Sequence, residues 1–278
     1  MSERRDLALT ELLQSIGDAG RHLGEIGATE GAAGNISVLL RGDLYGAEAL
    51  FPIMEPYTVP GVAGSVPELA GASIIVTGSG RRLWEIARDP MANLALLRFD
   101  ALGERAWLCV APNKLFSRPT SELNSHIAIH RQQALASSAT FQAVVHAQPL
   151  HIVYLSHLQR YRNALELNRR LFRWQPETIF QIPEGVGVLP FLLPGSAQLM
   201  EATLESMKTH QVVLWSKHGL IVRSDHSVKK AVDLIEYLET AARFEYMNFA
   251  NHDTADGLSN EEMRTFCDTY GIRQSIYS

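Results

Sequence analysis

Cysteine, basic residues and long apolar runs are all scarce in this sequence. Its 278 residues include two cysteines, Cys109 and Cys267, which lie far apart and lack the CxxC spacing of a cysteine-rich zinc site. The 25 Lys and Arg residues are outnumbered by 30 Asp and Glu, and the net charge is -5. Nucleic-acid affinity depends on clustered positive charge, so this composition argues against a nucleic-acid-binding protein.

The sequence also shows no segment typical of a transmembrane helix or a signal peptide. The longest apolar stretch, residues 186–194, is interrupted by Pro190 and is too short to cross a bilayer. The first leucines alternate with charged residues and do not form the apolar core of a signal peptide. We therefore expect a cytoplasmic protein with no membrane partner.

The first half of the chain indicates one long helix followed by strands. With 46% hydrophobic and 20% charged residues, the chain has the composition of a globular protein with a substantial core. Leucines and Ile16 recur at intervals of three and four residues and predict an amphipathic helix over 6–27. Short apolar runs separated by Gly, Pro and Asp predict strands at 35–40, 73–76, 94–99 and 106–111.

The second half mixes helices and strands. We expect strands at 141–146, around Ile179 and Val186, and at 212–216 and 220–222. Helices are expected at 121–136, on either side of Tyr161, at 196–210 and at 228–250. No linker or internal repeat marks a boundary. The sequence thus predicts a single α/β domain over 1–278, with a central, mainly antiparallel sheet flanked by helices.

Two segments place histidine where strands end. In VVHAQPLH an apolar strand stops at His146, and Gln148 two residues later would face the same side, because side chains alternate along a strand. In LWSKHGLIV, His218 lies at the tip of a predicted hairpin. Catalytic zinc sites commonly use three protein ligands, and these residues could supply them. For any single histidine, the residues alone favour the simpler role of bonding a backbone carbonyl.

The segment PTSELNSHIAIHRQ predicts a helix whose first turn contains Glu122 and whose cap is Thr120 or Ser121. Glu122, His126 and His130 recur every four residues along one face. Without a partner carboxylate motif, we assign His126 and His130 structural roles. Glu122 could face a site or simply be a solvated residue in the first turn.

Two glycine-containing loops could cradle an anion. VTGSGRR follows a strand, and its backbone N–H groups could approach a phosphate closely at Ser79 and Gly80. EGAAGNIS places Asn35 directly before another strand. Each loop alone is also compatible with an ordinary turn.

Taken in order, AGNIS, VTGSG, PTSE, the VVH segment and WSKHG resemble the class II aldolase/adducin family of zinc-dependent sugar-phosphate aldolases. The likeness extends from the first helix to about Tyr270 and is greatest to the members that act on L-rhamnulose 1-phosphate. It implies a homotetramer with active sites near subunit interfaces. It also implies an aldolase that binds one Zn²⁺ per subunit and cleaves a phosphorylated ketose into dihydroxyacetone phosphate and L-lactaldehyde.

The resemblance also implies roles for individual residues. His146 and His218 match two of the three zinc-binding histidines, and Gln148 stands at the third position. Glu122 matches the glutamate that moves a proton at the reacting carbon, and Glu177 matches a glutamate that reaches into a neighbouring subunit's site. The phosphate-binding residues that the resemblance implies are Asn35, Ser79, Gly80 and Ser121.

Two departures from the family pattern bear on function. Gln148 offers an amide oxygen where the family has imidazole, which predicts weaker zinc binding unless His151 substitutes for it. Ala32 stands where the rhamnulose-phosphate enzymes have an asparagine that contacts substrate. The alternatives are therefore a non-catalytic oligomeric binding protein of the same fold, or a metal-dependent epimerase or decarboxylase.

Overall fold

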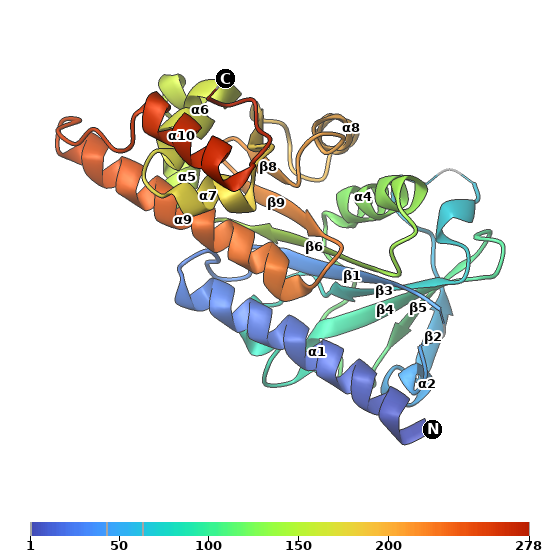
Figure 1. The fold of residues 1–278 in the computed structure, drawn as a ribbon. Coiled ribbons are helices and arrows are strands. Elements are labelled where there is room, and N and C mark those ends of the chain that lie inside the picture. Colours follow the sequence, from blue (N-terminus) through green and yellow to red (C-terminus); the bar gives the residue numbers. More distant parts are fainter. Residues whose placement is uncertain (1, 43, 63, 278) are drawn as a thin grey trace.

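A nine-stranded sheet forms the centre of the structure, a computed structural model that describes residues 2–42, 44–62 and 64–277 (Figure 1). Its strand order is β2-β5-β4-β3-β1-β6-β9-β8-β7, and every neighbouring pair is antiparallel except the parallel pair β7 and β8. The strands are β1 (Asn35–Arg41), β2 (Ile53–Pro56), β3 (Ala72–Thr77), β4 (Leu94–Phe99), β5 (Ala106–Val110), β6 (Phe141–Ala147), β7 (Val186–Leu189), β8 (Val212–Trp215) and β9 (Gly219–Ser224).

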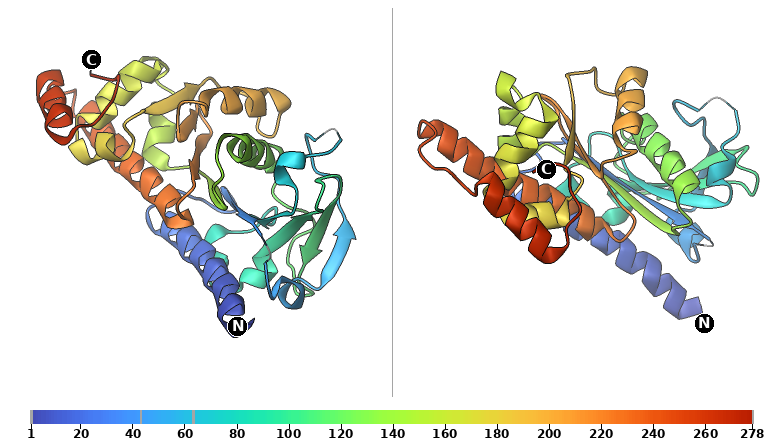
Figure 2. Two further views of the ribbon diagram at one scale, coloured as in Figure 1. Left: turned by 45° about the vertical axis from the view of Figure 1, so that its right-hand side comes forward. Right: turned by 45° about the horizontal axis from the view of Figure 1, so that its top comes forward.

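Helices cover both faces of the sheet. The two longest, α1 and α9, lie along one face, whereas α4 and α8 lie on the other (Figures 1 and 2). The helices are α1 (Ser2–Glu25), α2 (Ala47–Leu50), α3 (Pro90–Asn93), α4 (Leu123–Ala136), α5 (Leu150–Leu155), α6 (Ala164–Phe172), α7 (Pro176–Gln181), α8 (Ala197–Ser206), α9 (Val228–Ala250) and α10 (Asn260–Tyr270), with 3-10 turns η1 (Pro67–Leu69), η2 (Leu83–Glu85) and η3 (Gln159–Tyr161).

Successive side chains of β1 point to opposite faces of the sheet and pack into two different parts of the core. Ile36 and Val38 pack in the large cluster that includes the apolar stripes of α1 and α9. Leu39 packs in a second cluster with Ile127 of α4, and Ser37 turns its hydroxyl to the same helix. Because side chains alternate along a strand, α4 therefore covers the face on which Ser37 lies.

The predicted fold class is confirmed: the chain is α/β with one mixed, mainly antiparallel sheet flanked by helices. Helix 228–250 has the predicted bounds, and α1 spans Ser2–Glu25 where 6–27 was expected. The strand predicted around Ile179 is wrong, because this segment is helix α7, which begins with Pro176 at its first position and buries Ile179. The short edge strand β2 was not predicted, since all four of its residues are exposed and show no apolar alternation.

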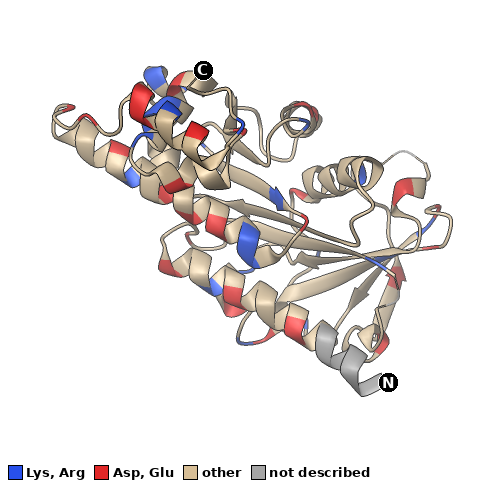
Figure 3. Ribbon diagram, in the orientation of Figure 1, with Lys and Arg blue, Asp and Glu red and all other residues tan. Residues whose placement is uncertain are grey.

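Charged side chains of both signs are distributed along α1 and α9 (Figure 3). Helix α9 carries Asp233 and Glu236 beside Lys229 and Lys230, and Glu236 Oε2 lies 2.9 Å from His22 Nε2 of α1. Among the described residues, no helix is both long enough and apolar enough to span a membrane.

Candidate functional site

The central strands bring the predicted site residues to one edge of the sheet. Asn35 begins β1 and lies opposite His146 near the end of β6. On the other side of β6, Ala147 lies opposite Leu220 of β9, whose first residue, Gly219, follows His218 directly. Antiparallel pairing therefore places the start of β1, the end of β6 and the β8–β9 turn side by side.

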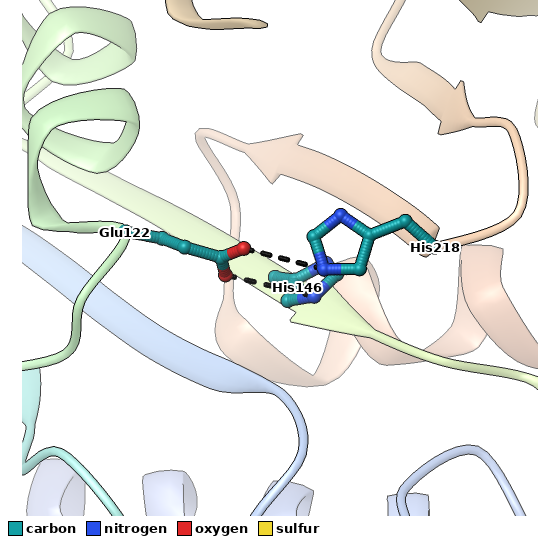
Figure 4. A group of neighbouring side chains, drawn as sticks. All are labelled: Glu122, His146 and His218. Atoms are coloured by element: carbon teal, nitrogen blue, oxygen red, sulfur yellow. Dashed lines mark ion pairs between the residues drawn. The ribbon is translucent and has the colours of Figure 1, made fainter. Parts of the chain in front are cut away.

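Glu122, His146 and His218 converge at this edge (Figure 4). Glu122 Oε2 lies 3.6 Å from His146 Nε2, and Glu122 Oε1 lies 3.4 Å from His218 Nε2. Glu122 and His146 are buried, and the side chain of His218 is 12% exposed. In the part of the chain that the structure describes, this is the one group of three or more His, Cys, Asp or Glu residues with the spacing to hold a metal ion.

The helix cap on which Glu122 lies differs from the expectation. Helix α4 begins at Leu123, Glu122 is its N-cap residue, and no side chain makes the capping hydrogen bond. Thr120 and Ser121 therefore do not cap the helix; Thr120 Oγ1 instead accepts a hydrogen bond from the Glu122 N–H at 3.4 Å. At the cap, the Glu122 side chain can point along the sheet edge toward the two imidazoles rather than along the helix.

A backbone hydrogen bond orients His146, whereas His218 Nδ1 is buried and has no hydrogen-bond partner among the described residues. His146 Nδ1 lies 2.9 Å from the Leu220 carbonyl oxygen and donates its hydrogen to it, so Nε2 carries the lone pair. Burial lowers the pKa of His218 to about 4, with the nearby His146 acting in the same direction and Glu122 opposing it. A neutral imidazole with a free lone pair is the form that ligates metal, so the lowered pKa of His218 fits a divalent cation, and His146 Nε2 faces the same carboxylate.

The β8–β9 turn holds His218 in place. Lys217 has a positive φ of 64° and its N–H donates to Ser156 Oγ at 2.7 Å, while the His218 N–H donates to the Trp215 carbonyl at 2.9 Å. The Trp215 ring stacks on His218, with ring centroids 5.2 Å apart. It also packs against His146, with ring centroids 4.9 Å apart. Neither Trp215 nor Ser156 was predicted; an aromatic residue three positions before the histidine of WSKHG was the signal for Trp215.

Gln148 and His151 occupy different surroundings. A Cβ added to Gly219 would lie 3.2 Å from Gln148 Cγ and 2.8 Å from His146 Cε1, so the Gln148 side chain begins beside His146 and the His218 turn. His151 lies in α5, where its Nδ1 contacts Glu239 Oε1 at 2.6 Å. Because the Glu122, His146 and His218 group does not include it, His151 does not replace the missing imidazole.

The predicted anion-binding residues lie on neighbouring segments. Gly78, in the loop after β3, pairs with Pro119 just before α4, and the Ser79 N–H donates to the Arg118 carbonyl at 2.8 Å. Gly80 has a φ of 73° and open space where a side chain would lie, and Ser121 is exposed. The loop containing Ser79 and Gly80 thus lies next to the residues that lead to Ser121.

Of the two remaining predicted site residues, Asn35 contacts Glu122 and Glu177 lies away from the site. The Asn35 amide is buried and donates from Nδ2 to Glu122 Oε2 at 2.8 Å, so it holds the carboxylate directly. Glu177 lies exposed in the first turn of α7, outside the Glu122, His146 and His218 group.

Comparison with known proteins agrees with this fold. A family model described as "Class II Aldolase and Adducin N-terminal domain" matches residues 14–246. The chain belongs to the class II aldolase/adducin family.

Several of the similar proteins are named aldolases. A rhamnulose-1-phosphate aldolase of Bacteroides thetaiotaomicron is 29% identical over 92% of this chain and 93% of its own length. One of Escherichia coli O7:K1 is 27% identical over 78% of each chain. The solved structure of a sugar-phosphate aldolase from Thermotoga maritima superposes with a TM-score of 0.73 and 27% identity, covering 87% of this chain and 97% of the other. The predictions of an enzyme of the aldolase (lyase) class and of its similarity to rhamnulose-1-phosphate aldolase are confirmed.

Proposed function

We propose that this enzyme is a metal-dependent aldolase that cleaves L-rhamnulose 1-phosphate into dihydroxyacetone phosphate and L-lactaldehyde. The observation that carries the proposal is the convergence of the Glu122 carboxylate with His146 Nε2 and His218 Nε2 at the sheet edge. The choice of substrate follows the relatives named rhamnulose-1-phosphate aldolase.

His146 and His218 would hold a divalent cation, and we assign Zn²⁺ because imidazole is a preferred zinc ligand. Gln148 begins beside both residues and would supply the third protein ligand through its amide oxygen. When bound, the cation would act as a Lewis acid that stabilises the negative charge left as the carbon–carbon bond breaks.

Glu122 would move the proton at the reacting carbon. Its carboxylate is buried at the same sheet edge, and one oxygen is held by the Asn35 amide. A group in this position has a fixed orientation, which favours proton transfer to or from a bound substrate.

The substrate's phosphate would bind between the loop after β3 and the start of α4. Among the described residues, no backbone carbonyl accepts a hydrogen bond from the N–H of Gly80 or Ser121, so both remain available to an anion. The Ser79 and Ser121 hydroxyls would add donors, and Asn35 would link this pocket to Glu122.

We further propose a homotetramer in which Glu177 acts at a neighbouring subunit's site. Glu177 is exposed on α7 and, among the described residues, lies outside the Glu122, His146 and His218 group, as expected for a side chain that acts on a partner.

The test is cleavage of L-rhamnulose 1-phosphate by purified protein, followed as dihydroxyacetone phosphate. One sample is stripped with chelator, a second is reloaded with Zn²⁺, and L-fuculose 1-phosphate serves as the alternative substrate. We expect turnover of the rhamnulose compound that disappears with the chelator and returns with Zn²⁺. A stripped enzyme as fast as the loaded one would contradict metal dependence, and no turnover of the rhamnulose compound in the loaded enzyme would contradict the substrate.

A further inference from the structure

A line of buried polar side chains connects the core to Glu122. It crosses from β6 through α4 and β1, and all of its members have an exposed fraction of 7% or less. In order toward Glu122, these residues are Gln142, His130, Ser37, His126 and Asn35. None of them lies within the metal-binding group, and buried polar groups in such a number need an explanation.

Each link in this line is within hydrogen-bonding distance. His130 Nδ1 lies 3.3 Å from Gln142 Oε1, and His130 Nε2 lies 2.8 Å from Ser37 Oγ. The same Ser37 oxygen lies 2.7 Å from His126 Nδ1, and His126 Nε2 contacts Asn35 Oδ1. The final link is the donation from Asn35 Nδ2 to Glu122 Oε2 at 2.8 Å.

Both histidines in this line are neutral at pH 7. Burial lowers the pKa of His126 well below its usual range, and protonation of the neighbouring His130 or His146 would lower it further; burial lowers the pKa of His130 to about 4. A neutral imidazole has one N–H donor and one acceptor nitrogen, so the partner of one nitrogen decides the role of the other.

The Glu122 end fixes the direction of every bond as far as His130. A carboxylate only accepts hydrogen bonds, so Asn35 donates from Nδ2 and its Oδ1 must accept from His126 Nε2–H. His126 Nδ1 is then an acceptor and takes the Ser37 hydroxyl hydrogen. Ser37 Oγ in turn accepts from His130 Nε2–H, which leaves a lone pair on His130 Nδ1.

The direction of the last hydrogen bond depends on which end of the Gln142 amide faces His130. The His130 Nδ1 lone pair needs a donor, yet the atom facing it is Gln142 Oε1, an acceptor. Gln142 Nε2 is buried without a hydrogen-bond partner. Turning the Gln142 amide by 180° is sterically neutral, because the two ends of an amide have nearly the same shape, and it brings the N–H₂ to the His130 lone pair. The Gln142 oxygen then takes the position without a partner, so the flip satisfies His130 and the amide nitrogen.

We propose that Gln142, His130, Ser37, His126 and Asn35 form a one-directional hydrogen-bond chain, the support chain, whose members are positioning residues for the Glu122 carboxylate. The proposal rests on the proposed role of Glu122 in the aldolase reaction. Each donor in the support chain has one acceptor, so loss of any link leaves a buried group unpaired and frees the Asn35 amide to turn away from Glu122.

Neutron diffraction from crystals of the full chain tests the direction. We expect deuterium on Nε2 and not on Nδ1 of both His126 and His130, and the Gln142 amide nitrogen facing His130. Deuterium on Nδ1 of either ring, or the Gln142 oxygen facing His130, would overturn the proposal. This measurement needs no catalytic activity, so it remains decisive even if the proposed function is wrong.

Kinetics of Ser37→Ala against Ser125→Ala test the positioning role. Each change removes one buried hydroxyl, from β1 at Ser37 and from α4 at Ser125, but Ser125 Oγ has no hydrogen-bond partner in the described part of the chain and lies outside the support chain. We expect Ser37→Ala to lower kcat by about tenfold or more with KM and zinc affinity unchanged, as for other residues that orient a functional side chain through hydrogen bonds. Ser125→Ala should match wild type.

Gln142→Leu interrupts the far end of the support chain and provides a second variant should Ser37→Ala fail to fold. It should lower kcat in the same direction, with KM unchanged. Wild-type kcat in a folded Ser37→Ala or Gln142→Leu protein would overturn the positioning role, as would equal losses in the Ser125→Ala control. If wild type itself fails to turn over the substrate, the proposed function is wrong and the neutron measurement decides the support chain.

Discussion

Gly219 lies so close to His146 that a side chain at residue 219 would collide with the imidazole. A Cβ built on Gly219 would be 2.8 Å from His146 Cε1 and 2.4 Å from the Ala147 carbonyl oxygen. Gly219 directly follows His218, so the absence of a side chain lets the β8–β9 turn carry His218 up against His146. A glycine at this position therefore makes the two-histidine arrangement possible.

Gly219→Ala should weaken metal binding and destabilise the fold together. The methyl group must displace His146 or separate β9 from β6, and overpacking of this kind costs about 1–3 kcal/mol. Zinc titration and urea unfolding measure the two effects. Gly24→Ala is the matched control, because its Cβ would meet Trp84 at an ordinary 3.6 Å and should leave zinc affinity unchanged. Equal zinc affinity in Gly219→Ala and wild type would contradict the close packing described.

Gln148→His should tighten zinc binding. An imidazole at residue 148 would replace an amide oxygen with a better zinc ligand, and we expect a gain of about tenfold or more, equivalent to ~1.4 kcal/mol. Gln148→Leu removes the amide and should weaken zinc binding. Competition with a chromogenic chelator measures both, and identical affinities for all three proteins would place Gln148 outside the metal site.

Glu122→Gln should abolish cleavage while zinc remains bound. The amide keeps the shape of the side chain but cannot exchange a proton, and loss of a general acid–base costs about 10²–10⁴-fold in rate. Turnover and zinc content are measured on the same preparation. Glu201→Gln, an exposed change on α8, should behave as wild type. Near wild-type turnover in Glu122→Gln would exclude the assigned role.

His151→Ala should reduce stability without changing zinc affinity. His151 Nδ1 contacts Glu239, which is only 7% exposed, and removal of the imidazole leaves that carboxylate with backbone donors alone. Loss of one hydrogen bond to a charged group costs about 1.5–3 kcal/mol, which urea unfolding will detect. The exposed His157→Ala is the control and should alter neither quantity. A fall in zinc affinity for His151→Ala would show that this residue does reach the metal.

Much of this arrangement follows from sequence patterns, and the rest depends on contacts that patterns do not encode. The apolar runs that end at His146 and flank His218 correctly predicted that these two histidines lie at strand ends, because local residue types mark the ends of strands. The role of Asn35 as a donor to Glu122 was missed, since it depends on the pairing of β1 with β6 and on where α4 begins. The prediction of a strand around Ile179 was wrong because a short apolar run is compatible with a strand or a helix. Pro176 favours the helix, since proline is common at the first helical position.

Acidification should destabilise the metal-free protein through its buried histidines. His130 has an ordinary pKa of 6.5 when unfolded and about 4 when folded, so between these values the unfolded chain binds more protons. Stability is therefore lost as pH falls through 6.5 toward 4, and His130 alone should cost about 2 kcal/mol between pH 7 and pH 5. His126 and His218, whose pKa values are lowered in the same direction, add to the loss.

Urea unfolding at a series of pH values in excess chelator measures this dependence without a contribution from metal release. His130→Gln removes one titrating group and should flatten the dependence between pH 7 and 5, even if the variant is less stable throughout. His226→Gln, at a side chain that is 80% exposed, should leave the slope unchanged. If His130→Gln loses as much stability as wild type over this range, His130 is not a source of the pH dependence, and the neutral ring on which the support chain depends would be contradicted as well.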